Sequence, residues 1–204
     1  MITLYGPARS SAGRCLWCLE EAGVKYENKN VDMKTKEHKS PDFLKINPNG
    51  KVPALVDGDV KLFESMAINF YIADKYKPTL LGNTPEERAL SYQWSFWASS
   101  EVQDPIIQIF IQKVFMPEEK RSQTTIDENM EKLPGYFTTL NNALNGKVYL
   151  NGRDFSLADL NTATVISIAP MIGIDMSAYK NIDTWLKGLS DRPAFQKYSE
   201  LRKS

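Results

Sequence analysis

Residues 47–68 read NPNGKVPALVDGDVKLFESMAI and contain the clearest secondary-structure signals of the chain. Two β-favouring segments, 53–56 and 60–63, flank Asp57-Gly58-Asp59, and an acidic residue followed by glycine between such segments is a strong hairpin signal. In the next segment, residues 64–76, apolar residues recur every three or four positions, as on one face of a helix. The stretch therefore predicts two antiparallel strands followed by a helix.

The segment that precedes this hairpin predicts a strand–helix–strand unit. Residues 2–5 and 24–32 are strand-like, and residues 11–22 between them have helical periodicity that Gly23 ends. Two strands joined through such a helix must run parallel. Ser40-Pro41 then opens one short helical turn. The order β-α-β-α-β-β-α predicts a mixed four-stranded sheet with helices, as in thioredoxin-like domains.

Beyond a linker at residues 77–85, only helical periodicity remains. We therefore predict two domains, a thioredoxin-like domain at residues 1–77 and an all-helical domain at residues 86–204. The expected helices of the second domain are a long one over 86–116, kinked at Asp104-Pro105, one over 122–144, one that starts with the capping-box pattern at 156–159 and runs to about 168, and short ones near 179–189 and 193–202.

Composition excludes several classes of function. Lys and Arg together number 25, as do Asp and Glu, so there is no electrostatic case for nucleic acid or an anionic membrane surface. No apolar run reaches the roughly 18 residues of a membrane span. The first residues lead directly into a strand without a basic targeting region, which favours a cytoplasmic protein.

The two cysteines, Cys15 and Cys18, form a Cys-x-x-Cys pair. A redox pair of this kind needs its first thiol at a helix N-terminus, where the helix dipole lowers the thiol pKa. Here the helix starts at Ser10 or Ser11, so both cysteines lie inside it and are expected to be small core residues. With a single histidine in the chain, they also make no metal-ligand set.

Two short pieces of residues 47–68 offer groups for a small zwitterionic peptide. Val52-Pro53 presents a backbone edge if its peptide bond is cis, and an extended peptide could pair there as an added strand. An ordinary trans bond is the alternative. Glu64 and Ser65 lie at a helix N-terminus, where a hydroxyl and free N–H groups suit a carboxylate and the acid suits an ammonium group. Alternatively, they only cap the helix.

Further polar groups lie in neighbouring loops. Ser10 and Ser11 follow the first strand, where a serine hydroxyl could donate a hydrogen bond to a bound thiolate; otherwise they serve as caps. His38 and Lys39 could clamp a distal carboxylate, or they form a solvated loop. No second histidine completes a catalytic triad, so a covalent serine nucleophile is not expected.

These motifs together resemble the cytosolic glutathione S-transferases, of the serine-type theta and phi classes, over nearly the whole chain. The resemblance rests on residues 47–55, 57–59 and 62–68, on Glu37-His38-Lys39-Ser40-Pro41, and on Phe155-Ser156-Leu157-Ala158-Asp159-Leu160. It implies a thioredoxin-like domain followed by a helical domain, a homodimer and a cis bond at Pro53. It implies no cofactor, because glutathione is a co-substrate.

The resemblance also implies a role for each site residue. Ser10 would stabilise the glutathione thiolate, with Ser11 beside it as the competing candidate and Tyr5 as a weaker one. Phi-class enzymes usually have glutamine at the position of Lys51, so a charge replaces an amide there. The implied glutathione contacts are Ser11, His38, Lys39, Lys51, Val52, Pro53, Glu64 and Ser65.

The function that the resemblance implies is transfer of glutathione to a hydrophobic electrophile. Four apolar residues of the kinked helix, Ile107, Phe110, Ile111 and Phe115, offer a wall for the electrophile, or they belong to the core. Other glutathione-dependent reactions (peroxide reduction, dehalogenation or isomerisation) would use the same glutathione site. A non-catalytic binding module on the same fold is the alternative from a different class. No cysteine lies in the loop between Gly6 and Arg14, which disfavours disulfide exchange.

Overall fold

The computed structural model of the chain describes residues 1–203 and divides into two compact units. The first comprises Met1–Leu81 and the segment that begins at Asp191, and the second comprises Gly82–Ser190. The sequence placed the domains at residues 1–77 and 86–204, whereas the first compact unit also includes the segment that begins at Asp191. No helix of the described residues is long and apolar enough to cross a membrane.

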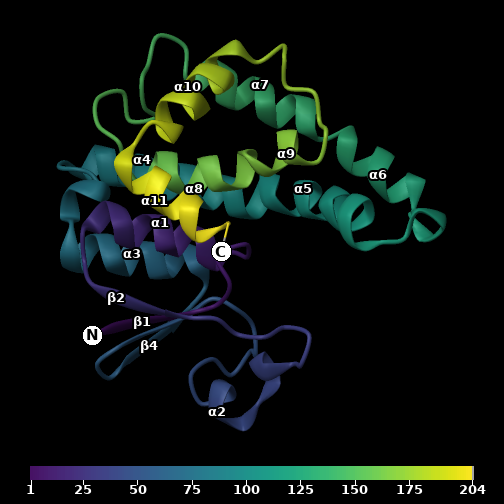
Figure 1. Cartoon of the computed structure of the whole chain (residues 1–204). Coiled ribbons are helices and arrows are strands. Elements are labelled where there is room, and N and C mark those ends of the chain that lie inside the picture. Colours follow the sequence, from purple (N-terminus) through teal and green to yellow (C-terminus); the bar gives the residue numbers. More distant parts are fainter. Residues whose placement is uncertain (204) are drawn as a thin grey trace. The chain divides into compact units, whose positions relative to one another are not determined.

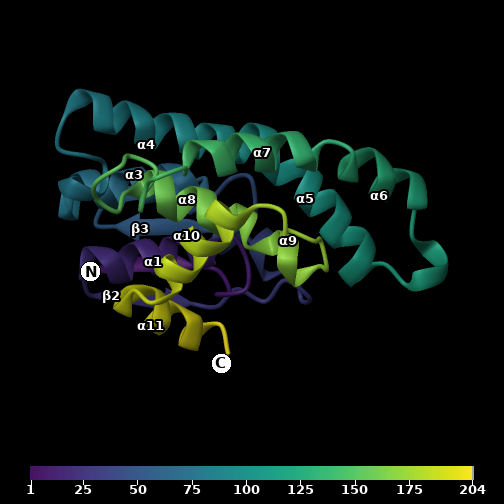
Figure 2. The same cartoon turned by 90° about the horizontal axis from the view of Figure 1, so that it is seen from above.

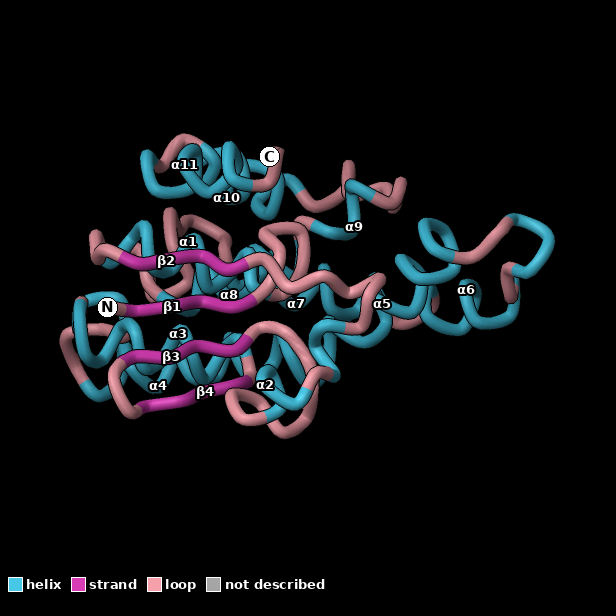
Figure 3. Tube along the Cα trace, turned by 60° about the horizontal axis from the view of Figure 1, so that its bottom comes forward, coloured by secondary structure: helices cyan, strands magenta, loops and turns pink. Residues whose placement is uncertain are grey.

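The first unit contains the mixed four-stranded sheet that the sequence predicted. Its strands lie in the order β2-β1-β3-β4, where β2 is parallel to β1, and β3 is antiparallel to both β1 and β4 (Figure 3). The bounds of the strands are Ile2–Tyr5 for β1, Tyr26–Lys29 for β2, Ala54–Asp57 for β3 and Val60–Phe63 for β4. The second strand is therefore shorter than the predicted 24–32.

Helices of this unit lie on both sides of the sheet. Figure 1 shows α1 (Ala12–Ala22) and α3 (Ser65–Tyr76) on one side and the short α2 (Pro41–Leu44) on the other. As predicted, Gly23 ends α1 in the left-handed conformation, with φ of 68°. The Ser40 side chain caps α2 by accepting a hydrogen bond from Phe43 N–H.

A small hydrophobic core lies around α2. Val31, Phe43 and Ala54 form it, with Tyr5, Ile46 and Val52 packed against them. The rings of Tyr5 and Phe43 meet edge to face, with centroids 6.2 Å apart. The alternation of β1, in which Ile2 and Leu4 are buried and Tyr5 is half-buried, thus serves both faces of the sheet.

Asp57, at the end of β3, joins the sheet to the C-terminal half of α3. Its Oδ2 accepts hydrogen bonds from Lys75 Nζ at 2.7 Å, from Tyr71 Oη at 2.8 Å and from Tyr76 Oη. Hydrogen bonds from Lys75 and Tyr76 are the main reason why the pKa of this carboxyl is lowered to about 2.

We expect Asp57→Asn to lower the free energy of unfolding at pH 7 by about 1–2 kcal/mol. An unfolded aspartate has a pKa of about 3.9, so the stabilisation by ionised Asp57 is present above that pH and is lost as pH falls towards 2. Urea unfolding between pH 3 and 7 should therefore show the difference between wild type and Asp57→Asn narrowing in acid. Asp59→Asn, at an exposed position of the same hairpin, is the control. A constant difference across this range would contradict the assignment.

The second unit begins with a long helical run that contains two π-helical turns. Helix α4 (Pro85–Trp97) passes into the turn Ala98–Val102, then into α5 (Gln103–Phe110) and the turn Ile111–Phe115. Pro105 has no N–H and so offers no i+4 donor to the carbonyl of residue 101, which lies in the first π turn. The predicted kink at Asp104-Pro105 thus lies directly after a widened turn.

The predicted single helix over 122–144 is wrong, because the structure has α6 (Gln123–Met130) and α7 (Leu133–Ala143) there. Pro134 lies in the first turn of α7. Its ring excludes the helical hydrogen bond to residue 130, so the helix breaks just before it. The remaining helices are α8 (Leu157–Ile166), α9 (Ile168–Met171), α10 (Lys180–Ser190) and α11 (Pro193–Leu201), the last of which belongs to the first unit.

Helix α8 is buried on nearly all sides and lies beside α4 (Figure 2). The predicted capping box is present, since Ser156 N–H donates to Asp159 Oδ2 at 3.1 Å. Asp159 Oδ1 accepts two further hydrogen bonds, from Leu150 N–H at 2.8 Å and from Trp185 Nε1 at 2.9 Å. Burial raises the pKa of Asp159 to about 6 and these hydrogen bonds oppose the rise.

Asp159→Ala should therefore lower the free energy of unfolding by about 2–4 kcal/mol, because it leaves several buried donors without an acceptor. Chemical denaturation followed by tryptophan fluorescence measures the loss. The matched control is Asp154→Ala at an exposed position of the preceding loop. Equal stabilities of the two variants would show that the Asp159 network does not hold the second unit together.

Candidate active site

The register of the sheet brings three predicted site segments to one end of it. Tyr5 of β1 is paired with Ala54 of β3, and Ala54 is paired with Phe63 of β4. The loop that starts at Gly6, the turn that ends at Pro53 and the helix start at Glu64 therefore all leave the sheet at this end.

Gly6 allows the first two of these segments to touch. Its φ is 137°, and a Cβ built on it would lie 2.9 Å from Ala12 Cβ and 3.1 Å from Val52 Cβ. Any side chain here would separate the start of α1 from Val52. The residue after β1 must be a glycine for both conformational and steric reasons.

The two serines differ in their surroundings. Ser10 is half-buried; its Oγ donates to the Pro7 carbonyl oxygen at 2.7 Å and accepts from Ala12 N–H at 3.1 Å. Ser11 is exposed at the N-cap of α1, where its side chain makes no capping hydrogen bond. Ser10 therefore has a hydroxyl held by the loop and the first turn of α1, whereas the exposed Ser11 side chain is not held by a capping hydrogen bond.

The Val52-Pro53 peptide bond is cis, as the resemblance implied. Val52 lies outside the strands, and none of the hydrogen bonds within residues 1–203 uses its backbone N–H or C=O. Its side chain is held by the small core around α2. Val52 thus combines a fixed position with a free backbone edge.

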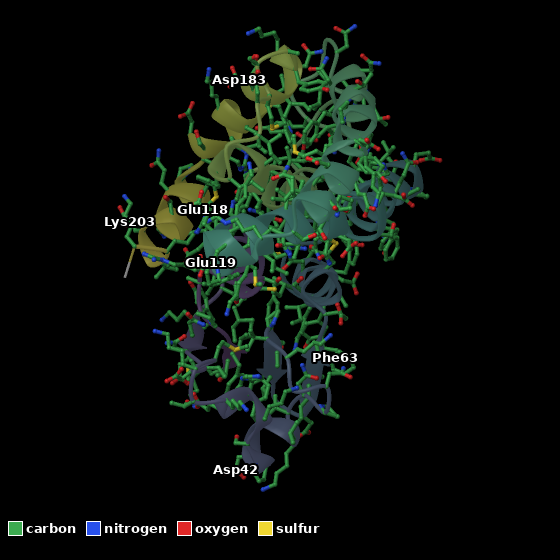
Figure 4. The ribbon with its side chains drawn as sticks, turned by 90° about the vertical axis from the view of Figure 1, so that its right-hand side faces the viewer. Asp42, Phe63, Glu118, Glu119, Asp183 and Lys203 are labelled. Atoms are coloured by element: carbon green, nitrogen blue, oxygen red, sulfur yellow. The ribbon has the colours of Figure 1, made fainter. Side chains whose placement is uncertain are left out.

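Glu64 begins α3 with an unusual backbone conformation, φ 68° and ψ 110°. Its carboxylate is exposed and does not cap the helix, which leaves the first N–H groups of α3 free. Ser65 is buried, and its carbonyl accepts a hydrogen bond from Cys15 Sγ at 3.4 Å, which ties this helix start to α1. Phe63, marked in Figure 4, precedes Glu64 and is 41% exposed.

His38, Lys39 and Lys51 meet at a second loop. Gly50 has φ of 57°, and a Cβ on it would lie 2.8 Å from Lys39 Nζ. Lys39 Nζ donates to the Asn49 carbonyl oxygen at 3.1 Å, and Lys51 is exposed. His38 Nδ1 is buried without a hydrogen-bond partner among the described residues. His38 and Lys39 thus lie against Asn49 and Gly50, shortly before Lys51 and Val52 in the chain.

Two residues that the sequence reasoning missed support these loops. Asn47 is buried; its Nδ2 donates to the Lys51 carbonyl oxygen at 2.6 Å, and its Oδ1 accepts from Asn49 N–H. The Asn-Pro-Asn-Gly run was a signal for such an Asx turn. Arg14 is buried in α1. Burial lowers the pKa of its guanidinium, and the nearby Tyr198 and Glu64 side chains act against this lowering. Nothing in the local pattern marked Arg14 as buried.

Both cysteines are fully buried, as predicted for core residues. Burial raises the pKa of the Cys15 thiol to about 12 and that of Cys18 well above its usual value. Burial thus disfavours the thiolate form of both cysteines, which argues against disulfide exchange. Among the described residues, no group of three His, Cys, Asp or Glu side chains could hold a metal ion.

The four residues predicted to contact an electrophile lie in the second unit. Ile107, Phe110 and Ile111 are half-buried and Phe115 is 70% exposed, whereas the core of α5 is made by Pro105, Ile106 and Ile109. The rings of Phe110 and Phe115 meet edge to face at 5.4 Å. These four are therefore an apolar surface beside the core rather than part of it. A cavity of about 410 Å³ between the loop at 144–149 and α10 contains none of them.

Comparison with known proteins identifies the family of the chain. The family models named glutathione S-transferase, N-terminal domain and glutathione S-transferase, C-terminal domain match residues 1–74 and 102–193. Glutathione S-transferase 1 of Zea mays is 40% identical over 98% of this chain and 96% of its own length. The chain therefore belongs to the glutathione S-transferase family.

Solved structures show the same fold. A structure of glutathione S-transferase-I bound with lactoylglutathione superimposes with a TM-score of 0.88 at 39% identity, covering 98% of this chain and 99% of that one. A theta class glutathione S-transferase of Xanthomonas axonopodis pv. citri with glutathione bound has a TM-score of 0.90 at 32% identity, covering 96% and 95% of the two chains. The predicted resemblance to this family is confirmed.

The positive φ of Glu64 predicts a measurable strain at the site. Glu64→Gly should raise the free energy of unfolding by about 1–2 kcal/mol relative to Glu64→Ala, because only glycine adopts positive φ without cost. Both variants remove the carboxylate, so the comparison isolates the backbone. Urea titrations of the two proteins measure the difference, and equal midpoints would show that Glu64 stores no strain.

Proposed function

We propose that the chain conjugates glutathione to hydrophobic electrophiles, with the thiolate stabilised by Ser10. The observation that carries the proposal is the convergence of unpaired groups at one end of the sheet. These are the Val52 backbone edge, the exposed Glu64 carboxylate and the uncapped start of α3. By contrast, the much less exposed carboxylates of Asp57 and Glu21 accept hydrogen bonds from side chains of the same unit.

Each part of glutathione has a complementary group. The ammonium of the γ-glutamyl head would pair with Glu64, and its carboxylate would accept from Ser65 and from the first N–H groups of α3. The cysteinyl backbone would pair with Val52 N–H and C=O beside Pro53, as a short added strand. The glycine carboxylate would lie among His38, Lys39 and Lys51.

Ser10 would act on the thiol by changing its hydrogen-bond acceptor. The Oγ–H, which donates to the Pro7 carbonyl oxygen, rotates to donate to the sulfur, while Ala12 N–H continues to hold the oxygen. Lowering a thiol pKa from about 8.5 by two units requires about 2.7 kcal/mol. One charge-assisted hydrogen bond together with the dipole of α1 supplies a stabilisation of this size.

The reaction then follows from the thiolate. The thiol proton passes to solvent, the sulfur attacks the electrophilic carbon, and a carbon–sulfur bond forms as the leaving group departs. Ile107, Phe110, Ile111 and Phe115 offer the electrophile an apolar surface. The proposal includes a homodimer and a cytoplasmic location, where thiols such as Cys15 stay reduced.

Alanine substitutions of the two serines test the mechanism. In conjugation of a chlorinated nitroarene, Ser10→Ala should lower kcat/KM by about 10²-fold, because it removes a donor to the developing charge. Ser11→Ala should stay within about threefold of wild type. The reverse result would assign the thiolate contact to Ser11, and equal effects would contradict a single donor.

Binding of glutathione, measured by titration calorimetry, separates an enzyme from a binding module. Wild type and Ser10→Ala should bind glutathione with similar Kd, whereas Glu64→Ala and Glu64→Gly should weaken binding by about tenfold or more. No binding by wild type at millimolar glutathione would overturn the proposed function. If wild type does not conjugate the nitroarene but reduces hydroperoxides, the protein catalyses another glutathione-dependent reaction instead.

A further inference from the structure

The C-terminal helix α11 belongs to the same compact unit as the sheet and packs along α1 (Figures 1 and 2). A partly buried ion pair anchors its start: Arg192 Nε lies 2.6 Å from Glu21 Oε1, and Arg192 Nη2 lies 2.8 Å from Glu21 Oε2. Trp17 Nε1 donates to the same carboxylate at 3.1 Å. The Trp17 ring meets Phe195 edge to face at 4.9 Å and lies parallel to Tyr198. These contacts between the start of α11 and α1 stabilise the fold.

Further along α11, Tyr198 lies close to the loop that carries Ser10. Tyr198 is 7% exposed, and its hydroxyl oxygen would lie 2.9 Å from a Cβ on Gly13. The same Cβ would lie 2.5 Å from the Ala8 carbonyl oxygen. Gly13 is thus enclosed between the Ser10 loop and the phenol, although a glycine inside a helix costs about 0.5–1 kcal/mol relative to alanine. The close approach of Tyr198 explains why no side chain is present.

Gly13 also connects Tyr198 to the serine. Its N–H donates to the Ser10 carbonyl oxygen at 2.9 Å. Displacement of Gly13 would move the first turn of α1, and with it the Ala12 N–H that holds Ser10 Oγ. A hydroxyl that must point at a sulfur is sensitive to shifts of this kind.

A second attachment holds the same loop from the end of α11. Arg9 Nε donates to the Arg202 carbonyl oxygen at 2.7 Å. The Arg202 guanidinium lies over the Tyr198 ring, 5.7 Å from its centroid. Burial raises the pKa of Tyr198, so its hydroxyl stays protonated at neutral pH. The residues on both sides of the loop, Arg9 and Gly13, therefore contact one short C-terminal segment.

We propose that α11 is part of the catalytic apparatus, with Tyr198 as a positioning residue that fixes the Ser10 hydroxyl through Gly13. This inference rests on the proposed function, because it acts through the contact between Ser10 and the thiolate. It distinguishes α11 from a helix that only stabilises the fold. The glutathione-binding groups Val52, Glu64 and Ser65 lie on other elements, so the effect should fall on the reactivity of the thiol and not on glutathione affinity.

The test measures the pKa of enzyme-bound glutathione from the ultraviolet absorbance of the thiolate as pH is varied. The proteins are wild type, Ser10→Ala, Tyr198→Phe and Tyr198→Leu, with Gln196→Ala, at an exposed position of α11, as the control. Glutathione Kd and thermal midpoint are measured on the same samples. Tyr198→Phe removes only the hydroxyl and is the variant that keeps the test valid if Tyr198→Leu does not fold.

Ser10→Ala should raise the thiol pKa by about two units. Tyr198→Leu should raise it by about one unit and Tyr198→Phe by about half a unit, with kcat/KM falling about tenfold and threefold. Measured at about pH 5.5, where bound glutathione stays a thiol in every variant, Kd should stay within twofold, and Gln196→Ala should match wild type.

The outcomes separate the two proposals. If Ser10→Ala shifts the thiol pKa and the folded Tyr198 variants do not, the positioning role is overturned and the proposed function stands. A fall in thermal midpoint without a pKa shift would likewise overturn the positioning role. If Ser10→Ala itself leaves the thiol pKa unchanged, the assigned serine is wrong and the inference that acts through it fails as well.

Discussion

The pairing of β3 with β1 and β4 is the constraint on which the site depends. Tyr5, Ala54 and Phe63 are side by side in the sheet, so the residues that follow or precede them must leave it together. A shift of this register by one residue would move Val52 away from the Ser10 loop and turn every side chain of the strand to the opposite face. The cores on the two faces of the sheet oppose such a shift. The site is thus positioned by hydrophobic packing that takes no part in the chemistry.

Charges are used differently inside the fold and at the site. Glu21, Asp57 and Asp159 each accept several hydrogen bonds, and each joins two elements of its own unit. At the site, by contrast, the Glu64 carboxylate is exposed at a residue with strained backbone, and His38 Nδ1 is buried without a partner among the described residues. Groups left unsatisfied lower stability, and they persist where a ligand completes them. The candidate site thus presents groups that a ligand can reach, whereas Glu21, Asp57 and Asp159 are satisfied within their own units.

Local signals in the sequence predicted the parts of this protein that depend on neighbours along the chain. The hairpin at Asp57-Gly58-Asp59, the cap at Ser40 and the capping box at Ser156 are of this kind. Pro134 was also a local signal for a helix break, but the helical periodicity on both sides of it favoured a single helix over 122–144. The cis bond at Pro53 could be predicted only from the family resemblance, because most X-Pro bonds are trans. The grouping of the chain from Asp191 with the sheet could not be predicted, because it depends on contacts of Trp17 and Glu21 with residues far along the sequence.

The two halves of the proposed reaction make different demands on the chain. Recognition of the thiol donor uses backbone groups, a helix N-terminus and short polar side chains, all fixed by the register of the sheet. The proposed electrophile surface uses the half-buried and exposed side chains of α5 and of the π turn that follows it, while Ile106 and Ile109 hold that helix in its core. Substitution of Ile107 or Phe115 alters an apolar surface and leaves this core intact. The proposed surface therefore lets the range of electrophiles change by substitution in α5 and the π turn, whereas the proposed thiol-donor site cannot change without rebuilding the sheet.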